Sequence, residues 1–245
     1  MCHWVYPVDS RLKNISINKM QKLAILGTGD SNIPDAETPY PISQAARNFE
    51  PHLRDVPGAV FPDTPLARQQ CARAYLAAGL QSERDGYAGL YINTVGDYGL
   101  AELREASVIP VTGAGEGAIR TAQANGQRFA IVTIWPPALR FIYDAILSST
   151  NAKSDCVAIH HLSEDPDLAT LEQADNFVSE MQACGITSMA RIREACLRAL
   201  EKDGADVIIL GCTCMQPVAA LLEADELPVI EPMVAGYRYL ESMLK

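Results

Sequence analysis

Two stretches of the sequence decide the fold: DGYAGLYINTVGDYGLAELREASVIPVTG at residues 85–113 and DGADVIILGCTCMQPVAALLEADELPVIE at residues 203–231. They align without a gap over 29 positions, eight of which are identical, and their apolar strand positions match as well. Each stretch has the same order of a helix stop, a short strand, a loop, a helix and a Pro-Val pair. Because chance similarity rarely preserves such an order, the sequence predicts an internal duplication.

The rest of the chain continues the alternation of short apolar runs with helical segments. Thr64-Pro65 is a typical N-cap and first turn, and Pro136-Pro137 opens another helix. Apolar strands that alternate with helices are typical of a mainly parallel sheet covered on both faces. The expected strands are 23–26, 90–93, 129–134, 156–162 and 206–212, and further helices are expected up to about 79, over 171–181 and over 189–200.

The predicted fold class is therefore α/β, with two pseudo-symmetric lobes, each a mainly parallel sheet flanked by helices. Residues 1–21 form an N-terminal extension, 22–112 the first lobe and 113–231 the second, and the C-terminal helix 232–245 joins the first lobe. Seven prolines in residues 30–65 predict a loop with room for one short helix.

Composition excludes several classes of function. The 245 residues hold 20 Lys and Arg against 30 Asp and Glu, a net charge of −10, so a nucleic acid or an anionic membrane surface is not an expected partner. No apolar run is long enough to span a bilayer, and the first residues lack the pattern of a secretory signal. Seven cysteines without regular spacing predict reduced thiols and a cytoplasmic protein.

Neither a metal nor a cofactor is predicted. The Cys-Thr-Cys at 212–214 is too closely spaced for an ordinary CxxC redox or zinc pair, and the four histidines have no metal-ligand spacing. The glycine-rich residues 112–119 superficially resemble a phosphate-binding loop, but tight packing against the sheet is the expected role.

The repeat also points to a site. In the alignment Thr94 falls on Cys212, and each residue follows a strand at its carboxyl end, where open α/β sheets place their ligands. If the lobes face one another, these two side chains approach a shared cleft from opposite sides. Two proton-transfer groups on opposite faces of one carbon are what inversion of a stereocentre requires.

Five segments carry a resemblance to a known family: NTVGDYGL, IPVTGAGEGA, RFAIVT, GADVIILGCTCM and LPVIEP. In this order they resemble the aspartate/glutamate/hydantoin racemase superfamily, above all its hydantoin and allantoin racemase branch, over roughly residues 22–244. The resemblance implies two lobes, a cofactor-free active site between them and a catalytic pair, usually two cysteines. The second of these corresponds to Cys212, whereas Thr94 stands where the first is usually found.

That substitution leaves the chemistry open. Some amino-acid racemases of the superfamily use a Thr/Cys pair, whereas the related arylmalonate decarboxylases keep only the second-lobe cysteine. The helix expected after Cys212 favours its thiolate, while a threonine hydroxyl ionises far outside the physiological range. We therefore expect Cys212 to carry more of the catalysis than Thr94.

The expected function is that of a cofactor-independent racemase or isomerase, acting at the carbon alpha to a carbonyl or carboxylate of a small amino acid or hydantoin-like substrate. One alternative is a decarboxylase with Cys212 as sole proton donor, and another is an inactive homologue that binds a small ligand. The sequence is compatible with a homo-oligomer. Candidate substrate contacts, in part as backbone N–H donors, are Thr28, Ser31, Asn32, Asn93, Val95, Gly96, Thr133, Trp135, Thr213 and Cys214.

Overall fold

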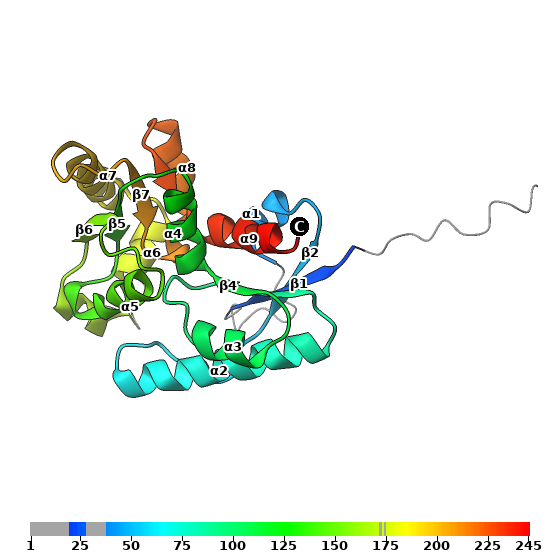
Figure 1. Cartoon of the computed structure of the whole chain (residues 1–245). Helices are drawn as coiled ribbons and strands as arrows, with labels where there is room; N and C mark the ends of the chain where they lie inside the picture. The colour runs from blue at the N-terminus through cyan, green and yellow to red at the C-terminus, as the bar shows by residue number, and fades with distance from the viewer. Residues whose placement is uncertain (1–19, 28–37, 172, 174) are drawn as a thin grey trace, which may run out of the picture.

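A computed structural model describes residues 20–27, 38–171, 173 and 175–245 (Figure 1). Within these residues the strands form two four-stranded sheets in which all paired strands are parallel. The strands are β1 (Lys22–Leu26), β2 (Glu50–Arg54), β3 (Gly89–Ile92), β4 (Val111–Gly113), β5 (Phe129–Thr133), β6 (Cys156–His161), β7 (Val207–Leu210) and β8 (Val229–Ile230).

Helices cover both sheets. They are α1 (Tyr40–Ala45), α2 (Pro65–Arg84), α3 (Leu100–Ala106), α4 (Ala114–Ala124), α5 (Phe141–Ser149), α6 (Phe177–Gln182), α7 (Ile186–Glu201), α8 (Gln216–Ala224) and α9 (Pro232–Met243), with short 3-10 helices η2 (Pro137–Leu139), η3 (Asp165–Thr170) and η4 (Thr213–Met215). The first sheet has the order β2-β1-β3-β4 and the second the order β6-β5-β7-β8. The two orders are equivalent, so the predicted α/β fold with two similar lobes is confirmed.

The apolar runs became central strands for a simple reason. Every residue of β3, β5 and β7 is buried, because helices lie against both faces of each sheet. The N-cap prediction is also confirmed, since the Thr64 side chain accepts a hydrogen bond from the Ala67 N–H at 3.1 Å.

Three local expectations were wrong. Strand β2 lies in the stretch expected to be loop, and its Pro51 is tolerated because β2 is an edge strand. Helix α2 continues past Gly79, where a side chain would collide with Leu103 of α3. The helix expected over 171–181 begins only after Asn176, whose side chain caps α6 by accepting hydrogen bonds from two backbone N–H groups.

The C-terminal helix α9 lies against α1, α4, β3 and β4 (Figure 1). Its crossing with α4 depends on two glycines, because a Cβ atom at Gly117 would lie 2.3 Å from the Cα of Gly236. The close contact of Gly117 is therefore with a helix, whereas the glycine-rich residues were expected to pack against the sheet. The boundaries of the lobes stay a prediction.

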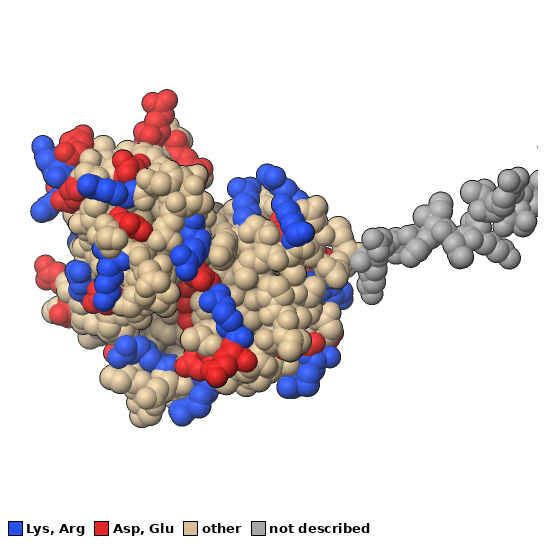
Figure 2. Space-filling model, viewed as in Figure 1, with Lys and Arg blue, Asp and Glu red and all other residues tan. Residues whose placement is uncertain are grey.

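Acidic and basic side chains are interspersed over the face of the molecule in Figure 2. Within the described part of the chain, none of the helices combines the length and the apolar character that crossing a membrane requires.

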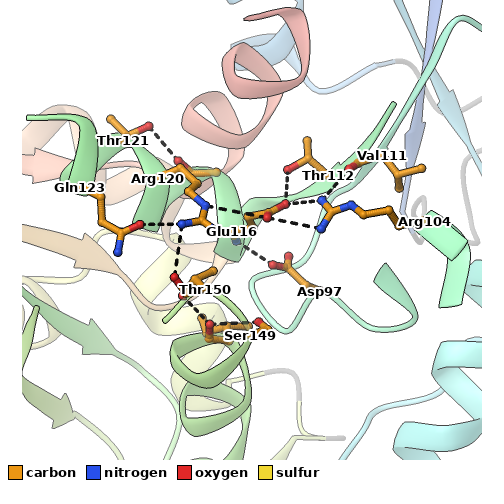
Figure 3. Close-up of polar contacts among 12 residues, drawn as sticks. Asp97, Arg104, Val111, Thr112, Glu116, Arg120, Thr121, Gln123, Ser149 and Thr150 are labelled. Carbon is orange, nitrogen blue, oxygen red and sulfur yellow. Dashed lines mark hydrogen bonds and ion pairs between the residues drawn. The ribbon is translucent and has the colours of Figure 1, made fainter. Parts of the chain in front are cut away.

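A polar network ties the loop after β3 to the start of α4 (Figure 3). The Asp97 carboxylate accepts hydrogen bonds from the backbone N–H groups of Gly115 at 3.0 Å and Glu116 at 2.6 Å. Glu116 in turn accepts hydrogen bonds from Arg104 at 2.6 Å and from the Thr112 hydroxyl at 3.0 Å. Asp97 therefore caps α4, although that helix begins 17 residues later in the chain.

The second lobe caps the equivalent helix differently. Glu231, which aligns with Gly113 in the repeat, accepts hydrogen bonds from the N–H groups of Met233 and Val234 at 2.8 and 2.9 Å. At Gly113 a Cβ would lie 2.0 Å from the Asp97 carboxylate, which occupies that space. In the first lobe the cap therefore comes from the loop that also carries Thr94.

We expect Gly117→Ala to lower the free energy of unfolding by about 1–3 kcal/mol, because the added methyl group forces α4 and α9 apart. Urea denaturation measures this change, with Ala101→Ser on an exposed helical face as a control that stays within about 0.5 kcal/mol. A stabilised Gly117→Ala protein, as helix propensity alone would give, contradicts the argument.

We expect Asp97→Ala to lower the free energy of unfolding by about 1–3 kcal/mol, because it leaves two N–H groups at the start of α4 without their acceptor. Urea denaturation measures this change. The control is Glu102→Ala, which removes an exposed carboxylate from α3. Equal effects of the two substitutions would show that the Asp97 cap contributes nothing specific.

Candidate active site

A cavity of about 370 Å³ lies between the two lobes, at the carboxyl ends of β3 and β7. Both lobes contribute to its lining. The loop after β3 supplies Asn93, Thr94, Val95 and Gly96, and the loop after β7 supplies Gly211, Cys212 and Thr213. The Thr213 hydroxyl donates to the Asn93 carbonyl oxygen across the lobes at 3.5 Å.

Thr94 and Cys212 occupy the same place in two copies of one turn. The Gly96 N–H donates to the Thr94 Oγ1 at 3.2 Å, and the Cys214 N–H donates to the Cys212 Sγ at 3.2 Å. Both side chains are partly exposed and line the cavity. The sequence repeat is therefore reproduced down to a single hydrogen bond in each lobe.

The remaining N–H groups of these turns form a matched pair. Val95 and Thr213 align in the repeat, and their backbone N–H groups make no hydrogen bond with the described residues. The neighbouring N–H groups of Gly96 and Cys214 are already used inside the turns. Val95 and Thr213 are thus the better candidates to bind a developing negative charge in the cavity.

Cys212 and Cys214 form a disulfide. The expectation of reduced thiols was wrong for these two residues, and their short spacing does not prevent a bond between the two sulfurs. Cys212 is extended, with φ −150° and ψ 140°, and the η4 turn that follows brings the two Cα atoms to 5.1 Å. That separation is within the range that disulfides bridge.

One wall of the cavity comes from a loop that sequence reasoning missed. Ala59, Val60, Phe61 and Pro62, between β2 and α2, line the cavity, and the Phe61 ring lies 5.2 Å from the ring of Trp135 in the other lobe. The available signal was an apolar run inside a proline-rich loop.

Helix α2 contributes Cys71 and Tyr75 to the lining, and Tyr98 adds a further ring. Burial raises the pKa of the Cys71 thiol, so this second sulfur in the cavity stays protonated. Burial also raises the pKa of the Tyr75 phenol well above its ordinary value.

Among the described residues, those that line the cavity carry no charged side chain. Arg68 lies one turn before Cys71 on the same face of α2, but its guanidinium is stacked on the Phe141 ring at 3.9 Å. Its Nε atom is buried without a hydrogen-bond partner among the residues that the structure describes. The polar groups of the cavity are thus mainly hydroxyls, one amide and the backbone.

A buried hydroxyl pair holds the backbone just before Cys212. The Tyr143 hydroxyl donates to the Gly211 carbonyl oxygen at 2.9 Å and lies 2.5 Å from the Thr133 Oγ1, which accepts from the Trp135 N–H at 3.1 Å. Thr133 is fully buried and its hydroxyl is used within the fold, so it supports the site from beneath rather than lining it. Tyr143, on α5, was not predicted.

The predicted contacts therefore divide into three groups. Asn93, Val95, Gly96, Trp135 and Thr213 line one cavity with Thr94 and Cys212. Thr133 and Cys214 adjoin it without lining it. Thr28, Ser31 and Asn32 lie outside the described residues.

Asp97 links this site to the fold. Its backbone N–H donates to the Thr94 carbonyl oxygen at 3.2 Å, so the residue whose carboxylate caps α4 also closes the turn of Thr94. Removal from water raises the pKa of the Asp97 carboxyl to about 8, while the Glu116 and Gly115 N–H groups act in the opposite direction.

Among the described residues, no group of three or more His, Cys, Asp or Glu side chains could hold a metal ion.

Comparison with known proteins gives consistent matches. The Asp/Glu/Hydantoin racemase family model matches residues 52–240. A hydantoin racemase of Pseudomonas sp. (strain NS671) is 26% identical over 67% of this chain, and one of Paenarthrobacter aurescens is 30% identical over 67%. These alignments cover 61% and 65% of the relatives' own lengths.

A solved structure of similar fold is the allantoin racemase from Klebsiella pneumoniae, with a TM-score of 0.70 and 24% identity, over 91% of this chain and 87% of that one. The family model covers more than half of the residues, and the two-lobed fold is consistent with it. The chain belongs to the Asp/Glu/Hydantoin racemase family.

Proposed function

We propose that this protein is a cofactor-independent racemase that moves a proton at a carbon next to a carbonyl group, with Cys212 and Thr94 on opposite faces of the substrate. The observation that carries the proposal is that these two residues, equivalent in the repeat, line one cavity from different lobes. The names of the curated relatives, which are hydantoin racemases, support the same activity.

In the proposed mechanism the reduced Cys212 thiolate removes the proton. Its sulfur accepts the Cys214 N–H at the start of η4, and such a position favours the thiolate over the thiol. The N–H groups of Val95 and Thr213 stabilise the charge that develops on the carbonyl oxygen. Loss of the proton leaves a planar carbon that can be protonated from the other face.

In this direction Thr94 acts on that other face as the proton donor, and in the reverse direction its alkoxide takes the proton back. After each turnover Thr94 regains a proton from water and Cys212 releases the one it took. The Gly96 N–H already occupies an acceptor position on its Oγ1, and the hydroxyl proton remains free to be donated into the cavity. Among the residues that the structure describes, no carboxylate or imidazole hydrogen-bonds this hydroxyl to activate it. The two groups are therefore chemically unequal, although kcat/KM stays the same in both directions because the equilibrium constant of a racemisation is unity.

The cavity favours a neutral ring over a dicarboxylate substrate. Its described lining offers hydroxyls, an amide and N–H groups among apolar and aromatic side chains, and none of these described residues is an arginine or lysine. A hydantoin-like ring presents carbonyl oxygens to such donors and carries an acidic carbon beside one of them. We therefore assign hydantoin-like rings as the substrate class.

A second candidate function is a decarboxylase, and the threonine at position 94 favours it. With a thiol at only one of the two paired positions, Cys212 alone would protonate the carbanion left by loss of carbon dioxide from a substituted malonate. Carbon dioxide release from an arylmalonate, without hydrogen exchange into hydantoins, would identify this activity.

We expect Cys212→Ala to abolish racemisation of a 5-substituted hydantoin, with a loss of about 100-fold or more in kcat, because no other group can remove the proton. Thr94→Ala should slow racemisation but still allow exchange of the carbon-bound hydrogen for deuterium in one enantiomer. Polarimetry and mass spectrometry in deuterium oxide, on enzyme reduced with dithiothreitol, measure both effects.

Reactions without enzyme correct for the spontaneous exchange of hydantoins, and Cys184→Ser is the matched control, since Cys184 is a free thiol that does not line the cavity. Full activity of Cys212→Ala would refute the assignment. If the wild-type protein binds hydantoins but turns over neither hydantoins nor malonates, it is a binding homologue.

A further inference from the structure

Cys214 is a second sulfur beside the proposed catalytic thiol. The mechanism above uses its backbone N–H, but gives its side chain no task. In the repeat Cys214 aligns with Gly96, so the first lobe has no counterpart of this sulfur. The structure joins Cys214 to Cys212 in a disulfide.

The other described cysteines are poorly suited to reaction. Cys71 and Cys196 are buried, and burial raises the pKa of each thiol, that of Cys196 to about 12. Burial likewise raises the pKa of Cys156 to about 11. Cys184 is partly exposed, with its Sγ 3.6 Å from the Pro217 carbonyl oxygen.

Cys212 differs from these four. Like Cys71 it lines the cavity, but its sulfur accepts the Cys214 N–H at the start of a helical turn, a contact that favours the thiolate, whereas burial keeps Cys71 protonated. A peroxide in the cavity would therefore react with the Cys212 sulfur, and Cys214 lies two residues away.

We propose that Cys212 and Cys214 are a redox modification site, at which a peroxide converts the active dithiol into an inactive disulfide and a dithiol reductant restores it. The loss and return of activity rest on the proposed function, because the disulfide removes the thiolate that would take the substrate proton. The formation of the bond itself does not depend on that function.

The chemistry balances in two steps. The Cys212 thiolate attacks one oxygen of hydrogen peroxide, the O–O bond breaks, and the departing hydroxide takes up a proton to become water, which leaves a sulfenic acid. The Cys214 thiol then attacks the Cys212 sulfur, the S–O bond breaks, and a second water leaves with the Cys214 proton. A dithiol reductant then restores the Cys212 and Cys214 thiols by thiol–disulfide exchange and becomes a disulfide itself.

The surrounding contacts suit a reversible change. With the disulfide in place, the Cys214 N–H still donates to the Cys212 Sγ and the Met215 N–H to the Cys212 carbonyl oxygen at 3.0 Å. Tyr143 still holds the Gly211 carbonyl oxygen. Reduction therefore returns the thiolate to a turn that is already built.

The test uses the full chain, reduced with dithiothreitol, desalted and treated with hydrogen peroxide. Peptide mass spectrometry should find the loss of two hydrogens in the peptide that contains residues 212–214, and dithiothreitol should restore both. Hydantoin racemisation, expressed as a fraction of each variant's own starting activity, should fall about tenfold or more with peroxide and return on reduction.

Cys214→Ser is the decisive variant, with Cys214→Ala as a second variant should the first fold poorly, and Cys184→Ser as the control. Without Cys214 the sulfenic acid has no partner thiol, so further oxidation should add two oxygens to Cys212 and make the loss of activity permanent. Cys184→Ser should recover like the wild type.

Two results would overturn the proposal: a wild-type peptide that keeps both hydrogens under peroxide, or a Cys214→Ser protein that recovers as fully as the wild type. If no hydantoin is racemised, the proposed function fails, but the peptide masses still decide whether the redox site exists.

Discussion

One hydrogen bond, made twice, organises this protein. In each lobe the residue that follows a central strand accepts the N–H of the residue two positions later, Thr94 from Gly96 and Cys212 from Cys214. The bond turns the chain sharply at the carboxyl end of a buried parallel strand, so the side chain faces the cavity rather than the sheet. Because the lobes repeat one topology, the same local turn brings Thr94 and Cys212 to the lining of one cavity.

The two copies have not kept the same supports. The second lobe caps its helix from within, through Glu231, and holds its reactive loop through the Tyr143 hydroxyl beneath Gly211. The first lobe has glycine at the matching cap position and borrows the carboxylate of Asp97, so that the Thr94 loop and α4 are fixed together. The helix cap is thus connected to the loop of a cavity-lining residue, Thr94, through Asp97.

Sequence reasoning reached the parts of this design that are written in local pattern. The repeat, the buried strands and the pairing of Thr94 with Cys212 follow from apolar runs and from a gapless alignment. The edge strand β2 was missed because a proline and charged residues suppress its pattern, although only one side of an edge strand needs backbone donors. The Phe61 wall and Tyr143 were missed because their roles arise from contacts between lobes or layers, which no local pattern encodes. The disulfide was not predicted because the Cys-Thr-Cys spacing is shorter than that of an ordinary CxxC pair. The extended backbone of Cys212 and the turn after it bring the two residues close enough to bond, and the sequence pattern does not show this.

The threonine at position 94 bears on both proposals. As a proton donor it can serve one face of a substrate, but a hydroxyl is not oxidised under conditions that convert a thiolate to a sulfenic acid. In the two proposals, the base and the target of peroxide are therefore both in the second lobe, where Cys214 is bonded to Cys212. If both paired positions were thiols, a peroxide could oxidise a sulfur on either side of the cavity. With threonine at position 94, the proposed oxidation begins at Cys212 and ends in its disulfide with Cys214. Because only one of the two paired residues is a thiol, the proposed inactivation needs a single disulfide, between Cys212 and Cys214. Reduction of that one bond restores the site.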